Sequence, residues 1–126
     1  MDVHQHHEEL MKGITAQFKD ILTHSKQSIY IYLDDIHMVW NKKFSSMLGY
    51  NSSKDMSNSN KSFLERFVDD KSQNAIVGAY RRAMEKHVGS TIAVTWKKKN
   101  GNRKKTNMIL VPIEFKNHIF AMHYIE

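Results

Sequence analysis

The chain has 126 residues, of which 40% are apolar, and a formal net charge of +6. This length suits one domain with a single core. No apolar run approaches the roughly 20 residues that a membrane-spanning helix needs, so we expect no membrane partner. The sequence has no cysteine, which excludes disulfides, thiolate metal sites and a cysteine nucleophile. The absence of cysteine and of an apolar N-terminal segment fits a cytoplasmic location.

Most of the excess positive charge lies in one short segment. Six basic residues flank Asn100-Gly101, a dipeptide typical of hairpin turns; they are Lys97, Lys98, Lys99, Arg103, Lys104 and Lys105. One alternative function is therefore a nucleic-acid-binding module that uses this hairpin. Only Trp96 lies close enough to stack on a base, so we favour a solvated turn whose charges prevent edge pairing, and do not expect a nucleic-acid partner.

Residues 5 to 24 are expected to form an amphipathic helix. Its apolar residues follow a 3-4-3 spacing; they are Met11, Ile14, Phe18 and Ile21. The seam covers only about two heptads, which is too short to be stable alone. The helix must therefore pack on its own domain, on the same helix of a second copy, or on both. We expect residues 1–24 to be a flanking, dimerising helix and residues 25–126 to form the domain.

Residues 28 to 33 predict a strand that is covered on both faces. Aliphatic side chains, such as Ile31, alternate with the aromatic rings of Tyr30 and Tyr32. The sequence period alone cannot decide which face points inward. We assign Ile31 to the interior and the two tyrosines to the dimer interface. Residues 37 to 40 form the next expected strand.

The stretch from residue 40 to residue 50 predicts a short capped helix. Phe44 and Met47 are spaced as on one helix face. Asn41 can accept a backbone N–H of the first turn, as helix N-caps do. Gly49 can end the helix because glycine enters the left-handed region without a steric cost.

The sequence after residue 50 predicts helices followed by strands. Residues 51 to 62 are expected to be a loop or weak helix, and Asp69-Asp70 is expected to start a longer helix that ends at Gly89. Three antiparallel strands follow, with Pro112 near a strand end or at an edge. Strands before and after a helical block favour an α+β domain with helices on one face of an antiparallel sheet.

These elements and their motifs resemble the PAS domain family. The matching residues are Asn41, Phe44, Gly49 and Tyr50, in the order of the family's N-x-x-F-x-x-x-x-G-Y pattern, then Phe67 to Asp70, Gly101 in the charged hairpin, and Val111 to Ile113. The resemblance covers residues 18–126. It implies a five-stranded antiparallel sheet of order 2-1-5-4-3, with Asn41, Gly49, Tyr50 and Gly101 as structural residues.

The resemblance also implies a function in signalling. PAS domains are non-catalytic sensory and interaction modules, so we expect an input module of a sensor histidine kinase or transcriptional regulator, or a domain that acts alone. A homodimer, a signalling partner protein and a small-molecule ligand are implied as partners. The candidate pocket residues are Ile31, Trp40, Phe44, Met47, Phe63, Phe67, Ile76, Tyr80, Val94, Trp96, Leu110 and Met122.

A cofactor-loaded gas or redox sensor is the second alternative. A flavin–cysteine adduct is excluded because the chain has no cysteine, and only His87 lies on the long helix where haem-binding members carry a histidine. We predict no cofactor, and the residues do not favour haem or flavin.

We predict no metal site either. His6 and His7 belong to an exposed end, and neither His118 nor His123 has a partner at metal-ligand spacing. No catalytic motif is present, so we expect no enzyme.

Overall fold

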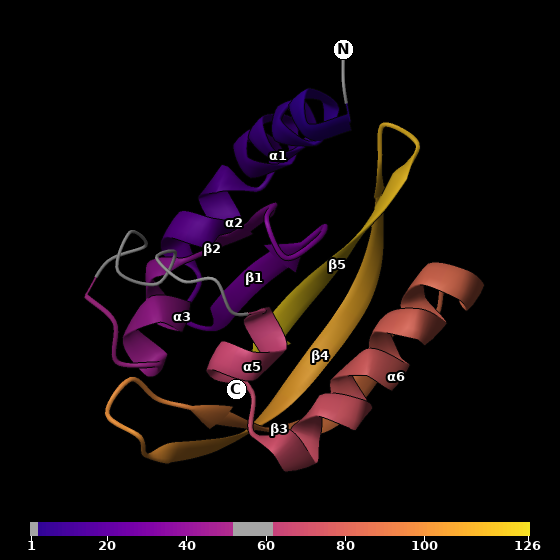
Figure 1. The fold of residues 1–126 in the computed structure, drawn as a ribbon. Helices are drawn as coiled ribbons and strands as arrows, with labels where there is room; N and C mark the ends of the chain where they lie inside the picture. Colours follow the sequence, from indigo (N-terminus) through magenta and orange to yellow (C-terminus); the bar gives the residue numbers. More distant parts are fainter. Residues whose placement is uncertain (1–2, 52–61) are drawn as a thin grey trace.

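The computed structural model describes residues 3–51 and 62–126, and the loop expected over residues 51 to 62 lies largely outside them. Five strands form one antiparallel sheet of order β2-β1-β5-β4-β3 (Figure 1). The strands are β1 Ser28–Tyr32, β2 Met38–Trp40, β3 Ser90–Lys97, β4 Arg103–Phe115 and β5 His118–Ile125. The predicted α+β class and strand order are confirmed.

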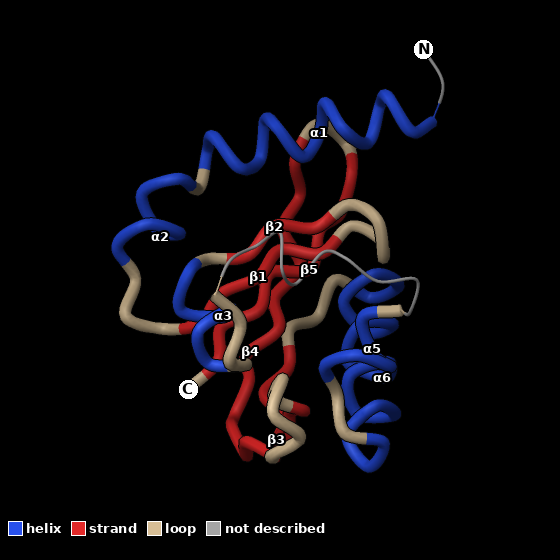
Figure 2. The backbone as a smooth tube through the Cα atoms, turned by 60° about the vertical axis from the view of Figure 1, so that its left-hand side comes forward, coloured by secondary structure: helices blue, strands red, loops and turns tan. Residues whose placement is uncertain are grey.

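Helices cover both faces of the sheet. They are α1 Val3–Gln17, α2 Lys19–His24, α3 Lys42–Met47, α5 Phe63–Phe67 and α6 Asp70–Lys86. Figure 2 shows α1 and α2 on one side of the sheet and α5 and α6 on the other. Helix α3 contributes Phe44 to the core shared with α5 and α6. Within the described part of the chain, no helix is both long and apolar enough to cross a membrane.

The N-terminal segment is bent rather than one continuous helix. The break falls at Phe18, whose φ of −102° and ψ of 14° lie outside the α-helical region. Leu10 and Ile14 are buried against the sheet, whereas Ile21 is 40% exposed. Leu22, not Ile21, packs on this core. Met11, Ile14 and Phe18 of the expected 3-4-3 spacing therefore pack on the protein's own sheet, but Leu22 takes the place expected for Ile21.

Helix α1 approaches the sheet closely at Gly13. A Cβ atom at this position would lie 2.9 Å from Cζ of Phe115, a distance that side chains do not tolerate. The glycine therefore allows α1 to lie against the end of β4.

The two central strands have one face toward each helical layer. In β1, Ile29 and Ile31 pack under α1, while Tyr30 joins the core on the opposite face. In β5, Met122 packs under α1, and the neighbouring residue His123 stacks on Tyr30. Successive side chains of a strand point to opposite faces, so each central strand contacts both layers.

Asn41 joins the start of α3 to β1. Its Oδ1 accepts hydrogen bonds from the N–H groups of Phe44 and Ile29, both at 3.0 Å. Its Nδ2 donates to the carbonyl of Gln27 at 2.9 Å. The predicted cap is confirmed, and the same side chain also binds the backbone at the start of β1.

The predicted turn residues also take their expected conformations. Gly49 and Gly101 have φ angles of 86° and 89°, in the region that favours glycine. Tyr50 packs edge-on against Phe67, with ring centroids 5.8 Å apart. Pro112 lies where β4 pairs with β5 alone, beyond the end of β3, so its missing N–H interrupts no inner ladder.

Helix α6 ends earlier than the sequence indicates. His87, not Gly89, adopts the left-handed conformation, with φ of 56°. Gly89 instead lies where a Cβ atom would be 3.1 Å from the carbonyl oxygen of Leu110. The glycine is needed for close approach to β4 rather than for ending the helix.

Replacing Asn41 by alanine should destabilise the protein by about 3 kcal/mol, because a helix cap is lost and a buried N–H of β1 loses its acceptor. Urea unfolding measures this difference. Ser46→Ala, at an exposed position of the same helix, is the matched control and should change stability by less than about 0.5 kcal/mol. Equal effects of the two substitutions would contradict the proposed role of Asn41.

Candidate functional site

A cavity of about 170 Å³ lies between the sheet and helices α5 and α6. Strands β1 and β5 contribute residues from one side, and the two helices contribute residues from the other. The lining residues are Tyr30, Tyr32, Asp35, Ser62, Phe63, Leu64, Ile76, Val77, Tyr80 and His123. The lining is mainly apolar with a few polar groups, which is the usual character of a small-molecule site.

Two tyrosines and one carboxylate form the polar part of the lining. The hydroxyl of Tyr32 donates to Oδ1 of Asp35 at 3.0 Å, and the Tyr80 ring meets the Tyr32 ring edge-on at 5.5 Å. Burial, with the charge of Asp35, raises the pKa of Tyr32. Burial raises the pKa of Tyr80 as well, with the charges of Asp34 and Asp35 adding to it. Both phenols therefore keep their hydrogen at physiological pH and can donate to a ligand.

His123 is the buried polar residue of the cavity floor. Its ring stacks on Tyr30 with centroids 3.8 Å apart and an angle of 9° between the planes. Nδ1 lies 3.3 Å from the carbonyl oxygen of Tyr30, and since a carbonyl only accepts, Nδ1 is the donor. Burial lowers the pKa of His123 to about 3, so the imidazole is neutral at physiological pH.

An aromatic cluster forms the wall behind the cavity. Phe44 and Phe63 each meet the buried Trp96 ring edge-on, at 5.5 and 6.2 Å. The indole N–H of Trp96 donates to the hydroxyl of Thr106 at 2.9 Å, and this hydroxyl donates to the carbonyl of Val94. With its polar atom paired, the large ring is fixed in one orientation.

The structure places the predicted pocket residues at several sites. Three of the twelve line the cavity: Phe63, Ile76 and Tyr80. Six others pack in the core behind it: Trp40, Phe44, Met47, Phe67, Val94 and Trp96. Leu110 packs with Ala79 and Ala83 of α6.

The assignment of faces in the central strands is corrected. Ile31 and Met122, expected in the pocket, pack under α1. Tyr30 and Tyr32, expected at a dimer interface, line the cavity. Both faces of these strands are apolar, so the alternation of side chains along them offers no basis for choosing the inward face.

The remaining candidates for the dimer interface lie on α1 and α2 or at the break between them. Ile14 is fully buried within its own chain, and Met11 and Phe18 are partly buried on the same core. Ile21 is the most exposed of the four.

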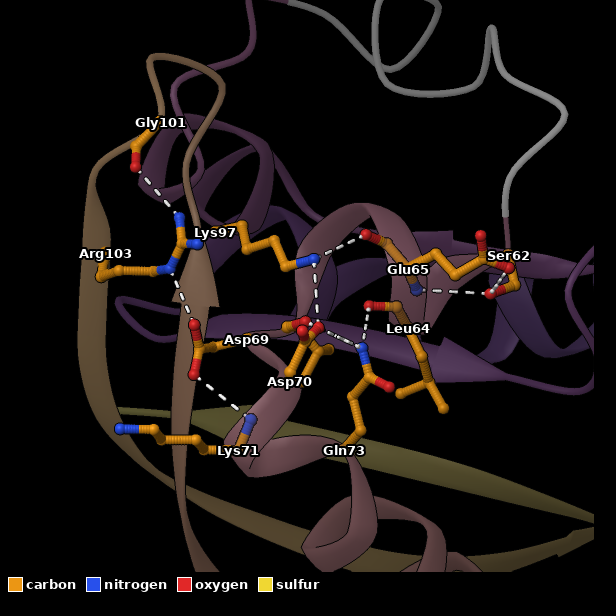
Figure 3. A network of polar contacts seen from close by, with 11 residues as sticks. Ser62, Leu64, Glu65, Asp69, Asp70, Lys71, Gln73, Lys97, Gly101 and Arg103 are labelled. Atoms are coloured by element: carbon orange, nitrogen blue, oxygen red, sulfur yellow. Dashed lines mark hydrogen bonds and ion pairs between the residues drawn. The ribbon is translucent and has the colours of Figure 1, made fainter.

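The basic hairpin is partly neutralised by the start of α6 (Figure 3). Nε of Arg103 donates to Oδ1 of Asp69 at 2.8 Å, and Nζ of Lys97 lies 3.7 Å from Oδ1 of Asp70. The hydrogen bond from Arg103 lowers the pKa of Asp69. Lys97 also donates to the carbonyl of Glu65 at 3.0 Å. These two cations hold the hairpin against the helical layer.

His87, the residue considered for haem ligation, is exposed at the C-terminal end of α6 and does not line the cavity. The histidine that lines the cavity is His123. Asp35 and Val77 also line it, and neither was predicted as a pocket residue from the sequence. The sequence predicted that His123 lies on a strand, but it did not predict the face of the sheet to which the side chain points.

Comparison with solved structures identifies the architecture. A PAS domain of an HTR-like protein from Haloarcula marismortui superimposes with a TM-score of 0.65 and 14% identity, covering 97% of this chain and 98% of that one. The chain has the PAS fold. A PAS domain from a two-component sensor histidine kinase gives a TM-score of 0.64 at 13% identity, covering 91% of this chain and 97% of that one. The LOV protein of Rhodobacter sphaeroides gives 0.63 at 16% identity, covering 100% of this chain and 68% of that one.

The likeness lies in structure and not in sequence, since no family model and no curated protein matches the chain. The sequence motifs around Asn41 and Gly49 nevertheless predicted the PAS fold, because they mark where its third structural element begins and ends.

Acidification should destabilise the protein through His123. The imidazole has its ordinary pKa of 6.5 in the unfolded chain and a pKa of about 3 when folded. Between these values the unfolded state binds more protons, so the free energy of unfolding falls as the pH decreases, by up to about 1.4 kcal/mol per pH unit. Urea unfolding from about pH 7 to about pH 4 measures this slope.

His123→Gln removes the titrating group and should give a shallower slope than the parent protein. His24→Gln, at an exposed histidine on α2, should keep the parent slope. Equal slopes for the parent and His123→Gln would show that His123 does not titrate in this range.

Proposed function

We propose that this protein is a non-catalytic sensory and protein-interaction domain in cytoplasmic signal transduction. It binds a small molecule in the cavity between the sheet and α5 and α6. The fold supports this proposal because one of its structural neighbours is a PAS domain from a two-component sensor histidine kinase. The chain would act as the input module of such a kinase or of a transcriptional regulator, or alone.

One observation carries the proposal: β1 and β5 are shared by the cavity and by α1. Tyr30 and His123 line the cavity, while Ile31 and Met122, next to them in the chain, pack under α1. A ligand that displaces either strand changes the surface on which α1 rests. Close packing transmits such a displacement because the interior has few voids to absorb it.

The ligand that fits best is a compact ring or short chain with one polar group. Cavities of about 150 Å³ in other proteins take molecules the size of benzene, and this cavity has about 170 Å³. Phe63, Ile76 and Val77 offer apolar contact, and the hydroxyls of Tyr32 and Tyr80 offer hydrogen bonds. This size favours a small organic molecule over haem or flavin.

The proposed output is a homodimer that forms through the N-terminal segment and the face of the sheet on which this segment packs. Ile21 on α2 is 40% exposed, and Ile109 on β4 is 39% exposed. Exposed aliphatic side chains of this kind supply the apolar contacts of subunit interfaces. Flanking helices that pair across such an interface would carry a shift of α1 to a partner domain.

A small phenol should raise the thermal stability of the parent protein. At 100 times the dissociation constant, a ligand that binds only the folded state adds about 2.7 kcal/mol. Val77→Phe, which places a larger side chain at the cavity, should abolish this gain. Differential scanning calorimetry with phenol measures both results, and native mass spectrometry of freshly purified protein detects a ligand that co-purifies.

The matched control is Val88→Phe, at a valine that is 48% exposed beyond the end of α6. It should keep the full stabilisation by phenol. If Val77→Phe also keeps it, phenol binds elsewhere and the cavity is not the ligand site.

Ile21→Asp and Phe18→Asp should convert a dimer into a monomer, because a charge at an apolar interface loses its hydration. Light scattering coupled to size-exclusion chromatography measures the mass. Val88→Asp, which adds the same charge at a distant exposed site, should keep the parent mass. A parent mass retained by Ile21→Asp would exclude α2 from the interface.

A further inference from the structure

Four histidines from three segments of the chain lie close together at one end of α1. His6 and His7 lie on α1, His37 closes the turn between β1 and β2, and His118 begins β5. The rings of His7 and His37 meet edge-on at 5.3 Å, and Nε2 of His6 lies 2.9 Å from Nε2 of His118. No two of these segments are close in the sequence, so motif spacing could not reveal the cluster.

Asp34 lies between two of these histidines, His7 and His37. Its Oδ2 is 3.1 Å from Nδ1 of His7 and 3.0 Å from Nδ1 of His37. Ligand atoms of His7, Asp34 and His37 all lie within 4.8 Å of one another. Two imidazoles and one carboxylate therefore converge on one small volume.

We propose that His7, Asp34 and His37 bind a zinc ion that fastens α1 to the turn between β1 and β2. The ion would contact Nδ1 of each imidazole and Oδ2 of Asp34. Each imidazole would then carry its hydrogen on Nε2. Water would occupy the fourth position, as in zinc sites with three protein ligands.

The distances fit a tetrahedral ion. With bonds of about 2.0 to 2.1 Å, neighbouring ligands of a tetrahedral zinc ion lie about 3.3 Å apart. The two distances from Asp34 Oδ2 to the imidazole nitrogens are close to this value, at 3.1 and 3.0 Å. The ligand atoms of His7 and His37 also lie within 4.8 Å of each other.

The backbone holds the carboxylate in position for this role. Oδ1 of Asp34 accepts from the N–H groups of Ile36 at 2.9 Å and His37 at 2.7 Å. Oδ1 also lies 2.8 Å from Nδ1 of His37, and Oδ2 is the oxygen within reach of both His7 and His37.

The ligand atoms, two imidazole nitrogens and one carboxylate oxygen, determine which class of metal ion the site would bind. Imidazole suits zinc and its neighbours in the first transition row, whereas Mg²⁺ and Ca²⁺ prefer oxygen ligands. The site is also partly shielded, since the side chains of His37 and His7 are 8% and 23% exposed. Such shielding reduces competition by water for the ligands.

Metal binding would control the same helix that the cavity contacts through the sheet. His7 is on α1, and both other ligands are on the turn between β1 and β2. An ion that bridges them would restrain the N-terminal half of α1. This inference stands on the histidine cluster alone, so a failed test of the cavity ligand leaves it intact.

The test is a Co²⁺ titration of the whole chain after treatment with a chelator. Tetrahedral Co²⁺ gives intense visible absorption bands, and Zn²⁺ should displace the ion and abolish them. We expect one ion per chain. His7→Ala, Asp34→Asn and His37→Ala should each weaken binding by about 100-fold or more, since even outer partners of metal ligands contribute about 10- to 100-fold.

The design keeps folding separate from binding. Asp34→Asn retains a side-chain oxygen for the N–H groups of Ile36 and His37, so the turn can persist without the charge. Circular dichroism of each variant checks that it is folded. The matched control is His24→Ala, because Nδ1 of His24 lies 3.1 Å from Oδ1 of Asp20 and no third ligand joins them among the residues that the structure describes. This control should bind Co²⁺ as the parent does.

Hydrogen exchange measures the effect on the helix. Saturating Zn²⁺ should slow amide exchange in α1 of the parent protein and of His24→Ala, but not in Asp34→Asn. The proposal is overturned if Asp34→Asn and His37→Ala keep the parent affinity, because the histidines of the N-terminal segment would then bind the metal without the turn. Weak Co²⁺ bands typical of octahedral coordination would overturn it as well.

Discussion

The hydrogen bonds of Asn41 hold β1 in one register against the start of α3. One amide side chain joins the backbone of residues 27 and 29 to the first turn of α3. A shift of β1 by one residue would bring Ile31 to the cavity and Tyr30 under α1, because side chains alternate along a strand. The set of residues that line the cavity and the surface on which α1 packs therefore both depend on this one register of β1.

The turn between β1 and β2 takes part in both proposed sites, the ligand cavity and the zinc site. Asp35 accepts a hydrogen bond from Tyr32 at the cavity, while the neighbouring Asp34 contacts His7 and His37 on the side of α1. A ligand in the cavity and an ion at the histidines would act on adjacent residues of the same turn. Each would change the affinity for the other by the same factor if they are coupled, because linkage is reciprocal.

Local chemistry predicted the parts of the fold that depend on neighbours in the chain. The helix starts at Asn41 and Asp69 were predicted correctly because a cap needs only a polar side chain beside a helical segment. The faces of β1 and β5 could not be predicted, since both are apolar and only the tertiary packing distinguishes them. The histidine cluster was equally hidden, because its members meet only after the sheet has formed.

The pairing of β1 with β5 has a consequence for how the protein folds. Residues 28–32 and 121–125 lie far apart in the chain but form the middle of the sheet. Closing such a long loop costs entropy before any contact compensates for it, so topologies of this kind fold more slowly than helical bundles. During synthesis, β1 and β2 leave the ribosome before β5, and β1 cannot form its pairing with β5 until β5 has left the ribosome as well. Until then, β1 has an unpaired edge that another strand could occupy, and the cell has to keep it from aggregating.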